Sequence, residues 1–281
     1  MISRLRRVVS KERDLKMVWE VHKGGKRSFL VGTAHFFPYR FMESLGRYIP
    51  QADAVLFEGP LDEESAKRVV AAGDAGNGQP SLLDALDAQT IGRIQAELGG
   101  ASQNLGAHLM YHALFGKAPQ RLEWSHLKGL KPWMAFFQIW SDYLRKNGWT
   151  YNMELDALRI ATDLGKDVRF LETIEEQIDA LDHVPIARFV TFLKNVSWRA
   201  SRREYVLHFL SGDLERLLSA ASGFPTFCES IVGRRDPILY TRMKTFFDAE
   251  KTIAFVGAVH CRGITARLVS DGFRVRSLAV T

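Results

Sequence analysis

The chain has 281 residues, of which 46% are hydrophobic and 25% are charged, and this composition excludes a disordered chain. The net charge of +6 is spread along the sequence, so we expect no nucleic-acid partner. No apolar stretch is long enough to span a membrane, no secretory signal is evident, and two cysteines are too few for a disulfide framework. We therefore expect a reduced, cytoplasmic protein without a membrane span.

The N-terminal part predicts a hairpin, a third strand and two helices. The apolar segments 17–22 and 28–31 flank a KGGK turn, which is typical of a β-hairpin. The segment MESLGRYIPQ then predicts a short helix. Residues 53–57 predict a buried strand that ends before Gly59, and residues 62–72 predict a helix with acidic residues in its first turn.

The middle of the chain, about residues 81–221, has a predominantly helical pattern. One interruption is the short strand VRFL, which follows a helix ended by Gly165. Thr173 and Glu176 then have the spacing of a capping box at the start of the next helix. The aromatic segment 133–144 is typical of a helix core, with a substrate groove or a homodimer face as alternatives.

Strand patterns return near the C-terminus. The segment GRRDPILYTRM predicts the start of a helix, TIAFVGAVH a strand, residues 263–270 a helix and FRVRSLAV a last strand. The expected fold class is therefore α/β (α+β), with a central mixed sheet built from both chain ends. We expect one domain over residues 1–281, in which the helical middle forms a cap or subdomain.

One spacing occurs twice, once at each end of the chain. FLVGTAHFF places Gly32 three residues before His35, and IAFVGAVHC places Gly257 three residues before His260. Each glycine lets the backbone turn sharply or approach a ligand closely. Because the histidine follows an apolar strand in both motifs, each imidazole is well placed for chemistry at the carboxyl end of a sheet.

Two glutamates occupy similar positions, and together with the histidines they suggest a metal site. Glu58 follows AVLF and Glu172 follows VRFL. Two imidazoles and one or two carboxylates suit a divalent cation with a position left open for water. The competing interpretation is that each of these is an ordinary hydrogen-bonded residue at a strand end, and the spacing alone leaves the two interpretations about even.

Several motifs in register resemble those of the TraB/GumN family, which includes the Tiki proteins. They run from residue 17 to the end of the chain. The matching segments are MVWEVHKGGKRSFLVGTAHF, ADAVLFEGP, ELDALRIATDLGKDVRFLETIEEQ, SGDLERLL, GRRDPILYTRM and FVGAVHCRGITARLVSDGFRV. Two departures are Arg234, where some members have an acid, and the absence of the membrane anchor that Tiki proteins have.

The resemblance implies a fold shared with the ChaN-like and erythromycin-esterase-like group. For the Tiki branch it implies a metal-dependent protease, so a peptide or protein substrate is the expected partner. Carried over by position, the implied site residues are the metal ligands His35, Glu58 and His260, the catalytic Glu58, Glu172 and Arg235, and the supporting Gly32, Gly257 and Asp236.

These residues predict a metal-dependent hydrolase, most simply a peptidase. The two histidines with Glu58 or Glu172 would hold Mn, Co, Zn or Fe, and the other carboxylate would act as general base. Arg235 would stabilise an oxyanion or hold a substrate carboxylate. The alternative, also suggested by the resemblance, is a non-catalytic protein that sequesters a peptide or haem.

Overall fold

The computed structural model describes residues 11–76, 80–98, 124–195 and 198–279, and among these a six-stranded mixed sheet forms the centre of the molecule. The strand order is β4-β3-β5-β2-β1-β6. Strands β2, β5, β3 and β4 run parallel, while β1 is antiparallel to both of its neighbours, β2 and β6. The strands span Val18–Lys23 (β1), Lys26–Thr33 (β2), Ala54–Phe57 (β3), Asp167–Phe170 (β4), Thr252–Gly257 (β5) and Arg274–Ser277 (β6).

The hairpin β1–β2 forms where the sequence predicts it. Gly24 and Gly25 have φ values of 56° and 76°, which a tight hairpin turn requires and which glycine adopts at no steric cost. The central strands β3 and β5 are almost wholly buried, as their continuous apolar runs predict. The stacked rings of Phe57 and Phe255, 5.3 Å apart, join these two strands on one face.

The predicted fold class, α/β with a mixed sheet built from both chain ends, is confirmed. The helices near the chain ends are α1 (Met42–Tyr48), α2 (Glu63–Ala72), α12 (Arg235–Ala249) and α13 (Cys261–Ser270). Those of the middle are α3 (Ala88–Leu98), α5 (Trp124–Leu127), α6 (Pro132–Lys146), α7 (Met153–Asp163), α8 (Ile174–Asp182), α9 (Ile186–Lys194), α10 (Trp198–Ser211) and α11 (Leu214–Ala221). The middle also supplies β4, and its residues 99–123 lie outside the described residues.

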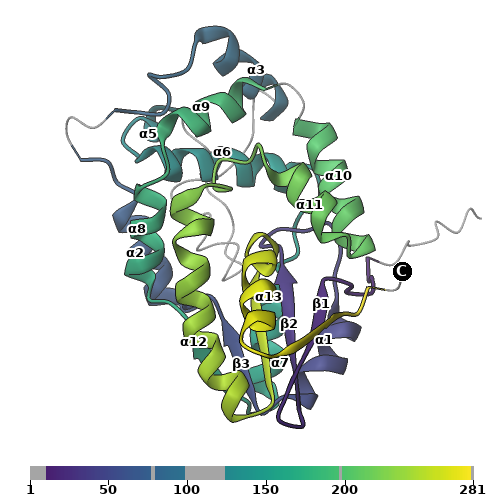
Figure 1. The fold of residues 1–281 in the computed structure, drawn as a ribbon. Coiled ribbons are helices and arrows are strands. Elements are labelled where there is room, and N and C mark those ends of the chain that lie inside the picture. Colours follow the sequence, from purple (N-terminus) through teal and green to yellow (C-terminus); the bar gives the residue numbers. More distant parts are fainter. Residues whose placement is uncertain (1–10, 77–79, 99–123, 196–197, 280–281) are drawn as a thin grey trace, which may run out of the picture.

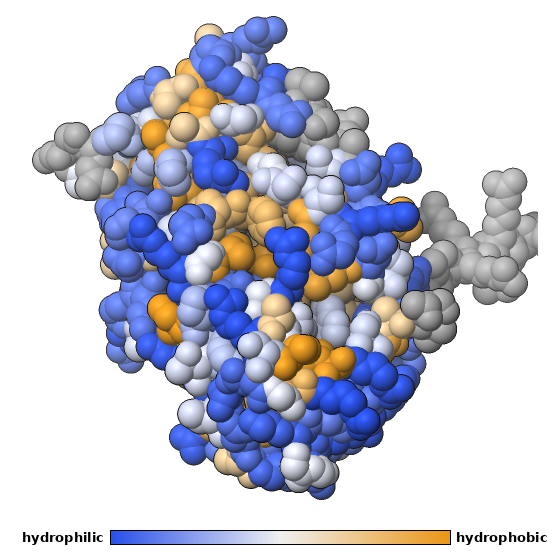
Figure 2. All heavy atoms as spheres, viewed as in Figure 1, coloured by the Kyte–Doolittle hydropathy of each residue, from blue (hydrophilic) through white to orange (hydrophobic). Residues whose placement is uncertain are grey.

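The helices are distributed unevenly around the sheet. In Figure 1, α12 and α13 lie in front of the sheet, where α12 contacts β5 and α13 contacts β2. Helices α3, α6 and α9 gather at the end of the molecule opposite the β1–β2 turn. Because β2 runs away from that turn, its carboxyl end faces these helices. Figure 2, which has the same view as Figure 1, shows apolar side chains in the middle of the face that is turned to the viewer.

Aromatic packing joins the helical middle to the rest of the chain. The segment 133–144 forms most of α6 and is largely buried, with the Phe136 ring 5.1 Å from that of Phe189 in α9. Phe37, just after β2, lies 4.7 Å from Phe209 of α10 and 5.6 Å from Trp149. The prediction of a helix core for this segment is thus confirmed, while the homodimer stays a prediction. No helix within the described residues is long and apolar enough to cross a membrane.

Candidate functional site

Two glutamates lie side by side at the carboxyl ends of β3 and β4. Phe57 and Phe170 are paired at the last residues of these parallel strands, and Glu58 and Glu172 follow shortly after. The backbone N–H of Glu172 donates to the carbonyl oxygen of Glu58 at 2.7 Å, which keeps the two segments together beyond the strands. Both side chains are buried, so their negative charges need partners.

Arg235, the first residue of α12, supplies that partner to both glutamates. Its Nη2 lies 2.9 Å from Glu58 Oε2 and 2.6 Å from Glu172 Oε2, and its Nε lies 3.0 Å from Glu172 Oε1. Burial would lower the pKa of Arg235, but the two carboxylates raise it above its ordinary value, so the guanidinium stays charged. Two of its three nitrogens thus hold glutamates, and the oxyanion role of Arg235 stays a prediction.

Glu58 remains ionised despite its burial. Desolvation would raise the pKa of its carboxyl group, but His260, Arg235 and His35 oppose this electrostatically, and the pKa falls to about 2. The backbone N–H of Gly257 also donates to Oε1 of Glu58. A carboxyl group with so low a pKa is a good cation ligand and a poor proton acceptor at neutral pH.

The carboxylate of Asp236 pairs with Nδ1 of His260 and fixes the position of its ring. It lies in a 3₁₀ turn, Ala258–His260, between β5 and α13, and is 2% exposed. Its Nδ1 is 2.7 Å from Oδ1 of Asp236, and its Nε2 is 3.7 Å from Oε1 of Glu58. In the neutral imidazole a carboxylate at Nδ1 keeps the proton there, so the Nε2 lone pair faces the lone pairs of Glu58. That arrangement is favourable only when a proton or a cation lies between the two atoms.

His35 has the same kind of support from Glu154. The Nδ1 of His35 is paired with Oε2 of Glu154, and Thr33 donates to Oε1 of the same carboxylate at 2.9 Å. Glu154 belongs to the first turn of α7 and is buried, whereas the side chain of His35 is 66% exposed. The charge of Glu154 raises the pKa of His35 above its ordinary value.

The glycines of the two motifs allow a close approach of neighbouring groups. Neither Gly32 nor Gly257 has a positive φ, so the backbone conformation at these positions does not require glycine. Their value is the absence of a side chain. A Cβ on Gly32 would lie 3.1 Å from Sγ of Cys261 and 3.3 Å from Cα of Ala258, and one on Gly257 would lie 3.2 Å from Oε1 of Glu58.

The two motifs are therefore neighbours in space. Strands β2 and β5 are paired in parallel, with Gly32 opposite Val256 and Thr33 opposite Gly257. This pairing brings the first and last thirds of the chain together at the carboxyl end of the sheet, where Gly257 and His260 lie beside Glu58. A sequence profile of the TraB/PrgY/gumN family matches residues 17–277, which is nearly the whole chain. The chain belongs to the TraB/PrgY/gumN family. No curated protein matches it.

The donor chemistry of this TraB-family site suits a metal ion. Two atoms bound to one ion, each at about 2.0–2.2 Å, lie roughly 3–4 Å apart, and the 3.7 Å between Nε2 of His260 and Oε1 of Glu58 falls in that range. Both histidines have a carboxylate at Nδ1, which is the usual support of a metal-binding imidazole. Within the described part of the chain, however, no three His, Cys, Asp or Glu side chains are already grouped to hold a metal ion.

Two residues, Glu154 and Gly263, have roles at the site that the sequence does not reveal. In the sequence, Glu154 resembles an ordinary acidic residue in the first turn of a helix, because Asn152, two residues earlier, caps α7. Gly263 leaves room for Asp236, since a Cβ there would overlap Oδ2 of Asp236. Cys261 is fully buried and burial raises the pKa of its thiol, so it is poorly suited to act as a nucleophile.

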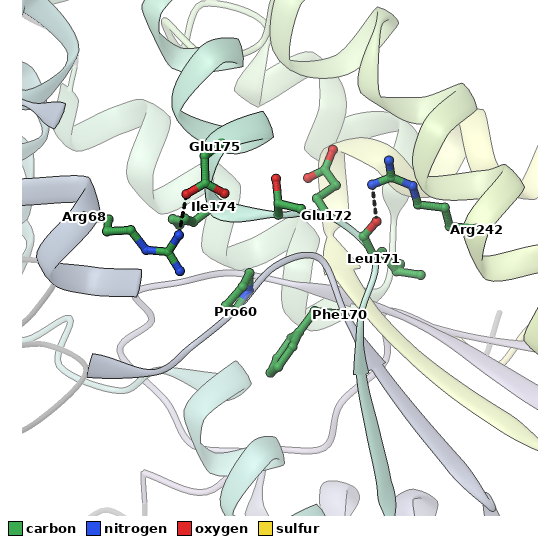
Figure 3. Close-up of a pocket in the computed structure, with 9 residues that line it drawn as sticks. Pro60, Arg68, Phe170, Leu171, Glu172, Ile174, Glu175 and Arg242 are labelled. Carbon is green, nitrogen blue, oxygen red and sulfur yellow. Dashed lines mark hydrogen bonds and ion pairs between the residues drawn. The ribbon is translucent and has the colours of Figure 1, made fainter. Parts of the chain in front are cut away.

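A hollow of about 480 Å³ lies next to this cluster, on the side of β4 and α8 (Figure 3). Glu172 is shared between the hollow and the cluster. The other lining residues are Pro60, Arg68, Phe170, Leu171, Thr173, Ile174, Glu175 and Arg242. Sequence patterns gave no sign of this hollow, because its lining comes from three separate segments.

Proposed function

We propose that this TraB-family chain is a hydrolase of peptide bonds whose site contains His35, Glu58 and His260 and takes up a divalent metal ion. The observation that carries the proposal is the pair of histidines on neighbouring parallel strands, each supported at Nδ1 by a buried carboxylate, with Glu58 facing one of them at 3.7 Å. Structural histidines at strand ends have no need of a buried carboxylate at Nδ1 in both motifs.

His35, Glu58 and His260 would hold the metal ion, which would supply Lewis-acid chemistry to the scissile carbonyl and to an attacking water. The remaining roles belong to the chain. Asp236 and Glu154 fix the protonated nitrogen of each imidazole and orient the rings. Arg235 keeps Glu58 ionised and in place, and Glu172 in turn positions Arg235 through its three contacts. Glu172 is therefore a positioning residue in this proposal rather than the general base.

A metal-binding measurement tests this directly. Metal-stripped protein is dialysed against Zn, Mn, Co and Fe(II) separately, and the bound metal is measured for wild type, His35→Ala and His260→Ala. His183→Ala is the matched control, since His183 lies on the surface of α8, away from the site. We expect bound metal in wild type and in the control and its loss in both site variants. Equal binding by all four proteins would refute the assigned ligands.

A second candidate function is favoured by the 2.7 Å contact between Asp236 and His260. A carboxylate–imidazole pair of this kind can act as a general base on its own, so hydrolysis without metal is the alternative mechanism. Activity that persists in chelator and is lost in His260→Ala would support it. The non-catalytic alternative, sequestration of a peptide or haem, predicts binding without turnover under either condition.

A further inference from the structure

We propose that the hollow beside Glu172 is a subsite for a large apolar side chain of an extended peptide, whose main chain pairs with the open edge of β4. This inference rests on the proposed function, because it takes the peptide to be the substrate of the same site. It adds a substrate preference that the cluster of histidines and glutamates does not provide.

The floor of the hollow is apolar and open. Phe170, Ile174, Pro60 and Leu171 line it, and Figure 3 shows Phe170 and Pro60 on the side facing the strands. The side chain of Phe170 remains 42% exposed although its ring lies 6.4 Å from that of Phe57. Covering such a ring with another apolar side chain is favourable, because apolar surface leaves water on both partners.

The charges around the hollow already have partners. Arg68 lies 2.5 Å from Glu175, and Arg242 lies 2.6 Å from Glu176 and donates to the carbonyl oxygen of Leu171 at 2.6 Å.

A capping box occupies the start of α8, beside the hollow. The capping box of Thr173 and Glu176 accepts from the backbone N–H groups at this helix start. Because Arg68 and Arg242 are both paired with carboxylates, neither arginine of the lining is left over for an anion. The lining of the hollow therefore favours an apolar occupant.

The edge of the sheet offers main-chain partners beside this floor. Strand β4 ends the sheet order and pairs only with β3 among the described strands. The N–H of Leu171 points to β3, because it donates to the carbonyl oxygen of Phe57 at 2.9 Å. By the alternation of a strand, the N–H and C=O of Phe170 point to the outer edge. An extended peptide can pair there, and its alternate side chains then meet the face that carries Phe170.

The location next to Glu172 connects this subsite to the chemistry. Glu172 lines the hollow and is joined through Arg235 to Glu58, which lies 3.7 Å from His260. A side chain in the hollow would therefore belong to a residue close to the bond that the site attacks. The preferred substrate has an aromatic or large aliphatic residue beside its scissile bond.

A binding experiment separates this inference from catalysis. The full chain is kept in chelator, and fluorescence anisotropy measures its affinity for a short fluorescein-labelled threonine peptide with one central phenylalanine. The comparison peptides have a central alanine, or the same phenylalanine with N-methylated neighbours that cannot pair with a strand. The variants are Phe170→Ala and Phe170→Leu, with Leu207→Ala, at an exposed position of α10, as the matched control.

We expect wild type to bind the phenylalanine peptide about tenfold more tightly than the alanine peptide, from the burial of one ring. Phe170→Ala should abolish the difference, Phe170→Leu should keep part of it, and Leu207→Ala should leave it intact. N-methylation should weaken binding to the level of the alanine peptide. Equal binding of the two unmodified peptides, or an unchanged preference in a folded Phe170→Ala, would overturn the inference.

Peptide binding tests the subsite, and peptide cleavage tests the hydrolase, so the two proposals can be refuted separately. A protein that shows the Phe170-dependent preference but cleaves no peptide keeps the subsite and refutes the hydrolase. A protein that cleaves peptides without regard to the residue at the hollow keeps the hydrolase and refutes the subsite. Far-UV circular dichroism and a melting curve of each variant establish that it is folded before its binding is compared.

Discussion

Asp236 and His260 form a buried pair in which Oδ1 and Nδ1 are 2.7 Å apart, although the two residues come from different helical segments. Asp236 lies in the first turn of α12, directly after the arginine that holds Glu58 and Glu172. One short segment thus organises both the imidazole and the carboxylates of the site. This dependence makes Arg235 and Asp236 the most informative positions to change.

Asp236→Asn tests the support of His260. An amide keeps the size of the side chain but lacks the charge that fixes the proton on Nδ1, so the ring loses its preferred tautomer. We expect metal affinity, or kcat/KM where turnover is measured, to fall by about 10- to 100-fold. Asp179→Asn, at an exposed position of α8, is the control and should leave both quantities unchanged. Wild-type values in Asp236→Asn would remove the positioning role.

Arg235→Ala tests the buried ion cluster through stability. The change leaves Glu58 and Glu172 buried without their shared cation, and we expect a loss of about 3–5 kcal/mol in the free energy of unfolding in urea. Adding Glu172→Gln should recover part of that loss, since one uncompensated charge disappears. Arg262→Ala removes an exposed pair with Glu215 and should cost no more than about 1 kcal/mol. Equal effects at the two arginines would contradict the cluster.

Gly263→Ala tests whether Asp236 needs the space at Gly263, an effect distinct from that of alanine on helix stability. Alanine favours a helix over glycine by about 1 kcal/mol, but here its methyl group would overlap Oδ2 of Asp236. We expect displacement of Asp236, seen as weaker metal binding and as a changed His260 signal in NMR. Gly92→Ala in α3 is the matched control, because nothing lies within 4 Å of a Cβ there, and it should only stabilise the protein. A Gly263→Ala protein with unaltered metal affinity would contradict the tight packing of Asp236.

Glu20 gives a prediction for pH. It is buried in β1 between Arg276 of β6, at 2.6 Å, and Arg27 of β2, at 2.9 Å. Burial raises the pKa of this carboxyl group, but the two arginines lower it from 4.5 to about 2. Because the pKa is lower in the folded state, its contribution is complete above about pH 4.5 and is lost as the pH falls toward 2.

The measurement is urea unfolding of wild type and Glu20→Gln at neutral pH and at about pH 3. The ionised pair contributes on the order of 2 to 3 kcal/mol at neutral pH, so the two proteins should differ most there and converge in acid. If the difference in the free energy of unfolding between the two proteins is the same at both pH values, the charge of Glu20 does not contribute to stability.

Local signals account for the parts of the fold that the sequence predicts correctly. Two glycines with positive φ make the β1–β2 turn, and Thr173 with Glu176 starts α8 as the capping-box spacing predicts. Strand ends were also predictable, because an apolar run followed by a polar residue marks the carboxyl end of a buried strand. For this reason His35, Glu58, Glu172 and His260 were found before their positions in space were known.

Long-range pairings account for what the sequence does not predict. The contact of His35 with Glu154 joins residues 119 positions apart, and that of Arg235 with Glu58 joins residues 177 positions apart. Such contacts depend on how distant segments pack together, which local sequence patterns do not specify. The groups for which the glycines of the repeated motif make room are not evident from the sequence for a similar reason. Their close neighbours, Cys261 and Glu58, come from other segments.

The most direct test of the central claim is the cleavage of an unbiased peptide mixture, followed by mass spectrometry. Wild type, His260→Ala and the control His183→Ala are compared as purified, after chelator treatment, and after the divalent metal is restored. The account predicts cleavage by wild type and His183→Ala that stops in chelator and returns with metal, and none by His260→Ala. Cleavage by His260→Ala at the wild-type rate, or wild-type cleavage that is indifferent to chelator, would contradict it.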